Sequence, residues 1–382
     1  MWSRVYSKLS NTCGRRLNST FRASEIVIDH TNNPKTMPVL DETLIFGKKT
    51  TDHLFWVDWD AKKGWHTPQI APYQPLVLDP TSSCFHYGTE CFEGMKAYKT
   101  AHDKVLLFRP EMNVRRLKKS AAALALPDFD GEEFLQCLRK FVDIERKWVP
   151  NKKGYSMYIR PTMIGTHQQL GVTKPAKAKL FIVNALVGPY FPTGFKPVAL
   201  YCDEARVRAW PGGVGDKKVG GNYGPGIAYT DEITKLGYQQ LLWLVNGNVT
   251  EVGTMNFFVL WKTKEGETEL ITAPLDSTIL EGVTRDSILT LTKEWGEFKV
   301  SERTFSIHEL VEAVDQGRVI EAFGAGTACI VCPVKKIHFK GKDYDIPMKL
   351  GNSGLLTKRL LDHILSIQYG EIHHPWSYQV DY

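Results

Sequence analysis

The chain has 382 residues, of which 43% are hydrophobic and 24% charged, and it carries a formal net charge of +6. At about 150 residues per domain this length predicts two domains, and no stretch approaches the roughly 18 consecutive apolar residues of a membrane span. Residues 1–24 hold five basic side chains and no acid, and subtracting these five from +6 leaves +1. A nearly neutral remainder argues against binding to nucleic acid. We therefore expect a soluble protein without a membrane or nucleic-acid partner.

The first 24 residues have the composition of a mitochondrial transit peptide, since they are rich in Arg and Ser and contain no acid. They lack the uninterrupted apolar core of a secretory signal. A basic tail on a cytosolic protein is the alternative interpretation. We expect the leader to direct the protein to the mitochondrial matrix.

The cysteines are odd in number and scattered, which is not the pattern of a secreted disulfide framework. One pair, Cys329 and Cys332, has CxxC spacing, and no second pair completes a zinc site. We therefore expect no metal. The seven cysteines are Cys13, Cys84, Cys91, Cys137, Cys202, Cys329 and Cys332.

Residues 25–188 are predicted to form a small N-terminal domain of strands and helices. Apolar residues at helical spacing predict helices over residues 111–125 and 131–148, the second ending before Pro150. Short β-rich runs bounded by turn residues predict the strands. These are residues 53–58, 75–78, 97–98, 105–108, 156–160 and 179–185.

Residues 189–197 are rich in Gly and Pro and predict a linker, after which residues 198–382 form a second, larger domain. A cleft between two such domains is a natural ligand site. Strands are predicted at 198–201, 240–245 and 257–261, the last two on either side of a turn at Asn246-Gly247. Helices are predicted at 228–236, 283–295, 306–315 and 355–365.

A glycine-rich segment over residues 211–226 contains Lys217 and Lys218. Glycines there indicate backbone that bends sharply or approaches a ligand closely. A lysine held against a ligand and shielded from water is a good nucleophile. A flexible loop with two solvated lysines is the alternative.

Three further features suggest a site for an anionic ring compound. Glu251 lies in a run that is otherwise apolar or small, where a carboxylate needs a cationic partner such as a protonated pyridine nitrogen. Residues 281–286 open an amphipathic helix whose free N–H groups would favour a phosphate. Residues 324–328 form a glycine-containing loop after an apolar strand and could add further donors.

Six strings in this order along the chain resemble those of branched-chain amino-acid aminotransferases. That family has fold type IV of the pyridoxal-phosphate enzymes, shared with D-amino-acid aminotransferases and aminodeoxychorismate lyases. The resemblance runs from about Gly47 onward and implies a two-domain fold of the α+β and α/β type. The strings are Phe92-Glu-Gly-Met-Lys-Ala-Tyr98, Tyr158-Ile-Arg-Pro161, Lys218-Val-Gly-Gly-Asn-Tyr-Gly-Pro225, Thr250-Glu-Val-Gly-Thr-Met-Asn256, Gly282-Val-Thr-Arg285 and Gly324-Ala-Gly-Thr-Ala328.

The resemblance implies that pyridoxal 5′-phosphate is bound covalently to Lys218, which lies two residues before Gly-Gly-Asn-Tyr, with Lys217 as a bystander. Lys218 would also be the base that moves the substrate proton. Tyr223 would bond the phenolic oxygen of the cofactor and Glu251 its ring nitrogen. The phosphate ligands would be Arg116, the backbone of Val283 and Thr284, and Thr327.

The implied reaction is a ping-pong transamination between leucine, isoleucine or valine and 2-oxoglutarate. Arg160 would meet the distal carboxylate of glutamate, and Ala328 would lie near the substrate carboxylate. A loop with Leu170 and Val172 would reach the pocket of a second subunit, which implies a homodimer. The walls of the side-chain pocket would be Phe46, Tyr87, Phe92, Tyr158, Tyr190 and Thr254.

Several alternatives remain open at this point. Mitochondrial mammalian members of the family use a CxxC as a redox switch, whereas Cys329 and Cys332 could equally be two buried apolar side chains. A thiol-redox protein is disfavoured because Pro333 follows the pair directly. A D-amino-acid aminotransferase or a lyase of the same fold is the other enzyme class to consider. One departure from the family is Glu281, an acid beside the expected phosphate site.

Overall fold

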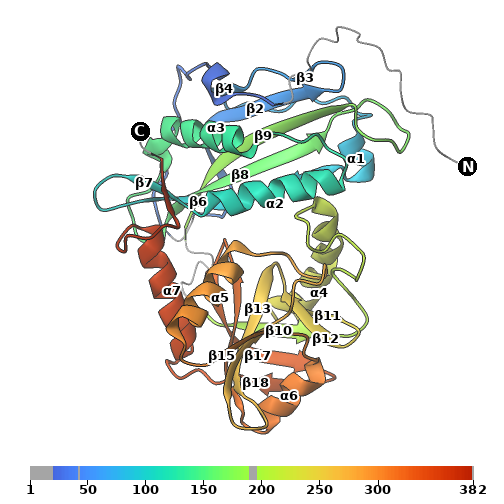
Figure 1. The fold of residues 1–382 in the computed structure, drawn as a ribbon, viewed down its shortest axis with the longest axis vertical. Helices are drawn as coiled ribbons and strands as arrows, with labels where there is room; N and C mark the ends of the chain where they lie inside the picture. Colours follow the sequence, from blue (N-terminus) through green and yellow to red (C-terminus); the bar gives the residue numbers. More distant parts are fainter. Residues whose placement is uncertain (1–19, 42–43, 189–195, 381–382) are drawn as a thin grey trace, which may run out of the picture.

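The computed structural model describes residues 20–41, 44–188 and 196–380, which form two lobes, each built on one β-sheet (Figure 1). The two-domain fold expected from the sequence is confirmed. Residues 1–19 of the expected leader, residues 189–195 of the expected linker and Tyr190 lie outside the described residues.

The first lobe contains a ten-stranded sheet in the order β1-β4-β2-β9-β8-β6-β7-β19, with β3 paired to β2 and β5 to β8. Its long central strands are antiparallel, and β8 and β9 pair over their whole length. The strands are β1 Val27–Ile28, β2 Lys49–Asp60, β3 Gly64–Trp65, β4 Gln69–Pro72, β5 Glu90–Phe92, β6 Met95–Lys99, β7 Val105–Phe108, β8 Ser156–Gly165, β9 Lys177–Val187 and β19 Ser377–Gln379.

The helices of this lobe are α1 (Ser83–Tyr87), α2 (Pro110–Ala123) and α3 (Gly131–Ile144). Asp130 begins α3 by accepting hydrogen bonds from two backbone N–H groups of its first turn. The apolar faces of α2 and α3 pack on the sheet, and α2 lies on the side of the lobe that faces the second lobe (Figure 1). This helix therefore carries its polar residues to the interface between the lobes.

The second lobe contains a nine-stranded sheet in the order β12-β11-β10-β17-β16-β13-β14-β15, with β18 on β17. An additional pairing between β12 and β13 closes part of this sheet into a barrel. The strands are β10 Val198–Cys202, β11 Gln240–Val245, β12 Asn248–Val252, β13 Met255–Lys262, β14 Thr268–Thr272, β15 Lys299–Glu302, β16 Val319–Gly326, β17 Ile330–Phe339 and β18 Lys342–Asp345.

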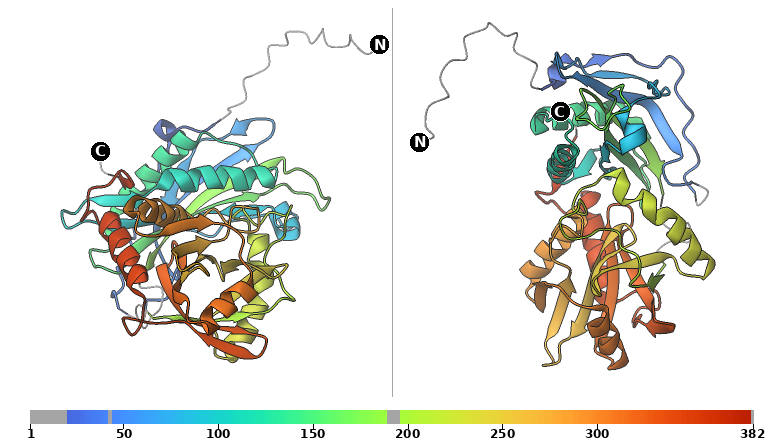
Figure 2. Two further views of the ribbon diagram at one scale, coloured as in Figure 1. Left: turned by 60° about the horizontal axis from the view of Figure 1, so that its bottom comes forward. Right: turned by 90° about the vertical axis from the view of Figure 1, so that its right-hand side faces the viewer.

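Four α-helices surround the second sheet, and α7 runs beside it towards the first lobe, as both views in Figure 2 show. No helix in the described ranges is long and apolar enough to cross a bilayer. The α-helices are α4 Ile227–Lys235, α5 Val283–Trp295, α6 Ile307–Asp315 and α7 Leu355–Gln368. Short 3-10 helices lie at Ala23–Glu25, Arg146–Trp148, Gly220–Asn222 and Gly224–Gly226.

The structure corrects three expected elements. Residues 75–78 are not a strand: the run begins with a proline, and Val77 is 95% exposed. The helix expected to reach residue 148 ends at Ile144 and continues as a 3-10 turn. A further strand, β12, lies between β11 and β13, so the turn at Asn246-Gly247 connects β11 to β12 rather than to residues 257–261.

The ends of the chain also differ from the expected domain boundaries. Phe21, assigned to the leader, is 1% exposed and packs against Trp65, Phe129 and Phe134 in the first core. At the other end, β19 pairs with β7 of the first sheet. The first lobe therefore begins before residue 25 and includes the last described strand of the chain.

Candidate active site

A cavity of about 370 Å³ lies between the lobes and is lined by residues from both. It brings together segments that are far apart in the sequence, from β8 and α2 of the first lobe to α5 and β16 of the second. The expected site residues that line it are Phe46, Phe92, Arg116, Tyr158, Arg160, Lys218, Tyr223, Glu251, Thr254, Val283, Thr284, Thr327 and Ala328.

Lys218 reaches the cavity from a segment fixed on both sides. Its backbone N–H donates to Ser120 Oγ on α2 (2.8 Å), and its carbonyl accepts from the Phe92 N–H (3.0 Å). Its Nζ lies 3.2 Å from Tyr223 Oη. Lys217 turns away from the cavity, because its Nζ pairs with Asp216 at 2.5 Å. Of the two lysines, Lys218 is therefore the one available for chemistry.

The glycines after Lys218 are needed for close packing. A Cβ at Gly220 would come within 1.8 Å of Glu90 Oε1, although the backbone there is not left-handed. The 3-10 turn at Gly220–Asn222 lets Tyr223 face back towards Lys218. The short loop thus sets the distance between the amine and the phenol.

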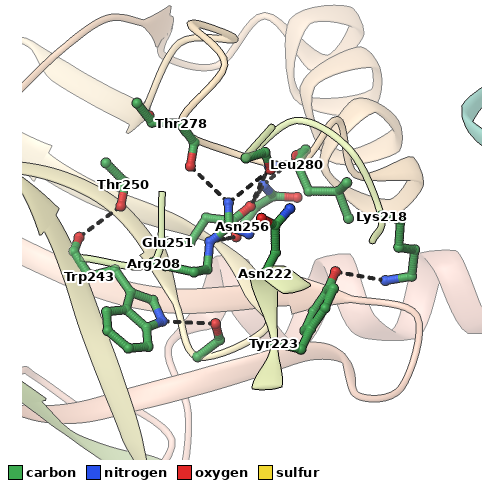
Figure 3. A network of polar contacts seen from close by, with 12 residues as sticks. Arg208, Lys218, Asn222, Tyr223, Trp243, Thr250, Glu251, Asn256, Thr278 and Leu280 are labelled. Atoms are coloured by element: carbon green, nitrogen blue, oxygen red, sulfur yellow. Dashed lines mark hydrogen bonds and ion pairs between the residues drawn. The ribbon is translucent and has the colours of Figure 1, made fainter. Parts of the chain in front are cut away.

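Glu251 lies at the bottom of the cavity in a polar network (Figure 3). Oε1 accepts from the Leu280 N–H at 2.7 Å and from Asn256 Nδ2 at 3.0 Å. Oε2 lies 3.0 Å from Arg208 Nε, and both side chains are 4% exposed. Arg208 Nη2 in turn donates to the carbonyls of Gly215 and Thr278. The cationic partner that the sequence required for Glu251 is thus present in the protein itself.

Burial raises the pKa of Glu251, and the Arg208 guanidinium is the strongest influence that opposes this rise. A carboxylate held in this way can accept a hydrogen bond from a protonated ring nitrogen. Arg208 was not recognised from the sequence, because it lies 43 positions from Glu251 on an irregular segment.

The N-terminus of α5 lies at the opposite end of the cavity. No side chain caps this helix, so its first N–H groups and its dipole are available to an anion. A Cβ at Gly282 would come within 2.0 Å of Asn256 Oδ1, which explains the glycine before the helix. With Thr284 and Thr327 also lining the cavity, this end fits a phosphate group.

Arg116 lines this end as well, but it is already paired. Its Nε and Nη2 donate to Glu93 Oε1 and Oε2 at 2.7 and 2.8 Å, and its Nη1 donates to the Glu281 carbonyl. Burial would raise the pKa of Glu93, yet the Arg116 charge holds it below its ordinary value. The Glu281 carboxylate interacts with Lys119 at 3.6 Å. Glu93 is thus a site carboxylate that the sequence reasoning missed.

The remaining wall of the cavity is aromatic with one cation. Phe46 and Tyr158 meet edge to face at 5.0 Å, and Phe92 packs against Tyr223 at 5.2 Å. Arg160 lies over the Phe92 ring and donates to Tyr158 Oη at 2.9 Å, while its buried Nε has no partner in the described chain. This surface suits an apolar side chain and retains one charge for an acidic one.

Two expected pocket residues are not in this cavity. Tyr87 is 38% exposed and donates a hydrogen bond to the Leu170 carbonyl, away from Lys218. Tyr190 falls in the part of the chain that is not described. Leu170 and Val172 are 62% and 81% exposed.

The cysteine pair lies beside the cavity. Cys329 lines it from the turn between β16 and β17, with its Sγ 3.1 Å from Met255 Sδ, and Cys332 is buried in β17. Both are free thiols. In the described ranges no group of three or more His, Cys, Asp or Glu side chains could hold a metal ion.

Residues 90–337 match the family model of amino-transferase class IV. A branched-chain-amino-acid aminotransferase of Dictyostelium discoideum is 49% identical over 360 residues, 94% of this chain and 95% of the relative. The cytosolic enzyme of Saccharomyces cerevisiae is 50% identical (93% and 96% covered), and the mitochondrial enzyme of Rattus norvegicus is 46% identical (96% and 94% covered).

Solved structures agree with the sequence comparison. The branched-chain amino acid aminotransferase of Escherichia coli has a TM-score of 0.70 at 26% identity, with 86% of this chain and 99% of that chain covered. A bacterial branched-chain amino acid aminotransferase complexed with N-(5′-phosphopyridoxyl)-L-glutamate has a TM-score of 0.68 at 26% identity (87% and 100% covered). This chain therefore belongs to the branched-chain-amino-acid aminotransferase family of the class IV amino-transferases, the fold type IV enzymes whose cofactor is pyridoxal 5′-phosphate.

Proposed function

We propose that this protein transfers amino groups between leucine, isoleucine or valine and 2-oxoglutarate, forming branched-chain 2-oxo acids and glutamate. The observation that carries this proposal is one cavity that joins a reactive lysine, a buried carboxylate–arginine pair and an aromatic wall with a single cation. The identity with relatives that are named for this activity supports it.

Pyridoxal phosphate supplies an electron-withdrawing ring that stabilises negative charge developing at the substrate Cα. Lys218 is its covalent anchor, and the freed Nζ takes the proton from Cα and returns one in the reverse direction. Glu251 holds the proton of the ring nitrogen, and Tyr223 bonds the phenolic oxygen. The phosphate is held by the N–H groups of Val283 and Thr284, with Thr327 and Arg116.

Arg116 contributes less net charge than an unpaired arginine, because Glu93 neutralises it. Most of the binding to the phosphate then comes from the helix N-terminus and the threonine hydroxyls. Glu93 fixes the plane of the guanidinium through two hydrogen bonds, and Arg116 Nη1 joins the two lobes at Glu281.

Both substrates use the aromatic wall, but in different ways. Burying a branched aliphatic side chain against Phe46, Phe92 and Tyr158 contributes roughly 1.5–3 kcal/mol. Glutamate instead brings a carboxylate, which Arg160 meets by exchanging its bond with Tyr158 Oη for a charged pair. A ping-pong enzyme needs this dual wall because both substrates occupy the same site in turn.

We further propose that the protein is a homodimer in which Leu170 and Val172 enter the pocket of the second subunit. Their high exposure in a single chain supports this, and Tyr87 would accompany them because it is bonded to the Leu170 carbonyl. A hollow of about 770 Å³ beside Tyr223 and Thr254, lined also by the exposed Val207 and Ile227, gives room for such a loop.

We also propose that the basic leader directs the protein to mitochondria. The relatives named above include one mitochondrial and one cytosolic enzyme, so the composition of residues 1–24 is the argument for this location. The burial of Phe21 limits the removable leader to the residues before it.

The decisive test is the visible absorption of the purified protein before and after addition of L-leucine, with Lys218→Ala and Lys217→Ala alongside. We expect the wild type and Lys217→Ala to be yellow, to lose this colour with leucine and to regain it with 2-oxoglutarate. Lys218→Ala should respond to neither. A wild-type protein that remains inert towards leucine after cofactor is supplied would refute the proposal, and turnover of D-alanine instead would indicate a D-amino-acid aminotransferase.

A further inference from the structure

Lys96 is a buried cation without a countercharge. It lies on β6, is 7% exposed, and its Nζ donates a hydrogen bond of 2.8 Å to the Ala328 carbonyl. Within the described ranges this carbonyl is its only hydrogen-bond acceptor, and no carboxylate forms an ion pair with it. Because burying an unpaired charge is costly, such a residue is a candidate for a functional role.

The hydrogen bond of Lys96 crosses from one lobe to the other. Lys96 belongs to the sheet of the first lobe, where it pairs directly with Tyr158 across the strands. Ala328 lies in the turn of residues 327–329, which joins β16 to β17 in the second lobe and lines the cavity. Lys96 therefore stands behind this turn and fixes its position relative to the aromatic wall.

The other cations around the cavity already have partners. Arg116 is paired with Glu93, Arg160 is bonded to Tyr158, and Lys218 is the expected anchor of the cofactor. An amino acid and a 2-oxo acid both carry an α-carboxylate, and a carboxylate buried in a cavity requires a positive field. Lys96 is the cation that remains for it.

We propose that Lys96 is a positioning residue that holds the turn of residues 327–329 and supplies the positive charge against which the α-carboxylate of either substrate binds. This inference rests on the proposed transamination. Lys96 acts through the turn and through its field, so it is not itself a catalytic residue. Its effect is on the affinity for the carboxylate and not on proton transfer at Cα.

The protonation of Lys96 provides a second line of support. Burial lowers its pKa to about 8, and the titratable groups nearest to it are the Cys329 thiol on the turn, Tyr158 on β8 and Tyr98 on its own strand. Lys96 is thus charged at pH 7 and loses its charge as the pH rises through 8. Affinity for a substrate carboxylate should fall over the same range.

The test measures binding to the cofactor-loaded enzyme by calorimetry, with 4-methylvalerate as the probe. This compound keeps the side chain and carboxylate of leucine but has no amino group to react or titrate. Its neutral amide is the matched probe without charge. The variants are Lys96→Met, which removes the charge, and Lys96→Arg, which keeps it at every pH used.

At pH 7 we expect Lys96→Met to bind 4-methylvalerate about tenfold more weakly than the wild type, from the loss of a charge at reduced dielectric. Binding of the amide should be unchanged. Between pH 7 and pH 9.5 the wild type should lose carboxylate affinity, whereas Lys96→Arg should not.

Unchanged carboxylate binding in Lys96→Met, or an equal loss for acid and amide, would overturn the inference, the second result indicating a merely structural role. If Lys96→Met fails to fold, the comparison of wild type and Lys96→Arg across pH still decides. Leucine turnover by the wild type is assayed separately, so a failure of the proposed function is distinguishable from a failure of this inference.

Discussion

Arg208 Nε lies 3.0 Å from Glu251 Oε2 inside the second lobe, and the two side chains are equally buried. The arginine is held by the carbonyls of Gly215 and Thr278, so it cannot follow the carboxylate if the latter moves. The pair is therefore a fixed support beneath the ring of the cofactor.

Replacing Arg208 by Met should weaken cofactor binding. Without the guanidinium, burial would leave Glu251 protonated at neutral pH, and a protonated carboxyl group accepts a weaker hydrogen bond from the ring nitrogen. The loss of one charge-assisted hydrogen bond predicts an increase of about 10- to 100-fold in the dissociation constant of pyridoxal phosphate. Equilibrium dialysis of the apoenzyme measures this constant.

The matched control is Arg206→Met, because Arg206 stacks on Tyr229 and pairs with Glu232 at the surface without touching Glu251. We expect it to bind the cofactor as the wild type does. Wild-type affinity in a folded Arg208→Met protein would show that Glu251 does not depend on this partner.

Replacing Arg160 by Met should separate the two substrate classes. The variant keeps an apolar wall for leucine but has no charge for the distal carboxylate of glutamate. A lost charged hydrogen bond predicts a decrease in kcat/KM for glutamate of about 10- to 100-fold, with leucine nearly unaffected. Rates of the two half-reactions, followed by the absorbance of the cofactor, give both values.

Tyr158→Phe serves as the comparison for Arg160, since it removes only the hydroxyl that Arg160 Nη2 uses when glutamate is absent. It should change the ratio of glutamate to leucine turnover far less than Arg160→Met does. A parallel decrease for both amino acids in Arg160→Met would mean that Arg160 supports the pocket as a whole.

Much of this site could be predicted from the sequence, because the residues with chemical roles occur in short strings. Lys218, Tyr223 and the helix beginning at Val283 belong to such strings, and the helix has its expected bounds because Gly296 ends it in a left-handed conformation. The supporting partners could not be predicted in this way. Glu93 meets Arg116 only because β5 packs against α2, and periodicity along the chain carries no information on that contact.

Gly282→Ala should disrupt the phosphate end of the site. The new Cβ would lie within 2.0 Å of Asn256 Oδ1, so Asn256 or the start of α5 must shift, and Asn256 also donates to Glu251. Such overpacking typically destabilises a protein by about 1–3 kcal/mol. We expect a lower melting temperature and weaker cofactor binding, both measured against Gly226→Ala.

Gly226 is a suitable control because a Cβ there makes only an ordinary contact of 3.4 Å with Trp243, and its backbone also has negative φ. Should Gly282→Ala match this control in both measurements, the close packing around Asn256 would not be needed for the phosphate site.

Peroxide should slow turnover reversibly through Cys329 and Cys332, but only slowly. Burial raises the pKa of Cys329 to about 12 and raises that of Cys332 as well, so little of the reactive thiolate is present at neutral pH. We expect activity to decline over hours and to return with a thiol reductant. Activity measured with parallel thiol titration tests this, and Cys332→Ser should abolish the effect. Constant activity despite loss of the titratable thiols would exclude a redox role.

The pairing of β19 with β7 bears on how the protein is made. Val380 is fully buried in the first core, and Arg139 Nε on α3 donates to its carbonyl, so the last described residues complete the lobe that is synthesised first. The first lobe cannot close its sheet until the ribosome has released the end of the chain. During translation it must wait with the edge of β7 open, and the whole enzyme then folds as one interdependent unit rather than as two domains in succession.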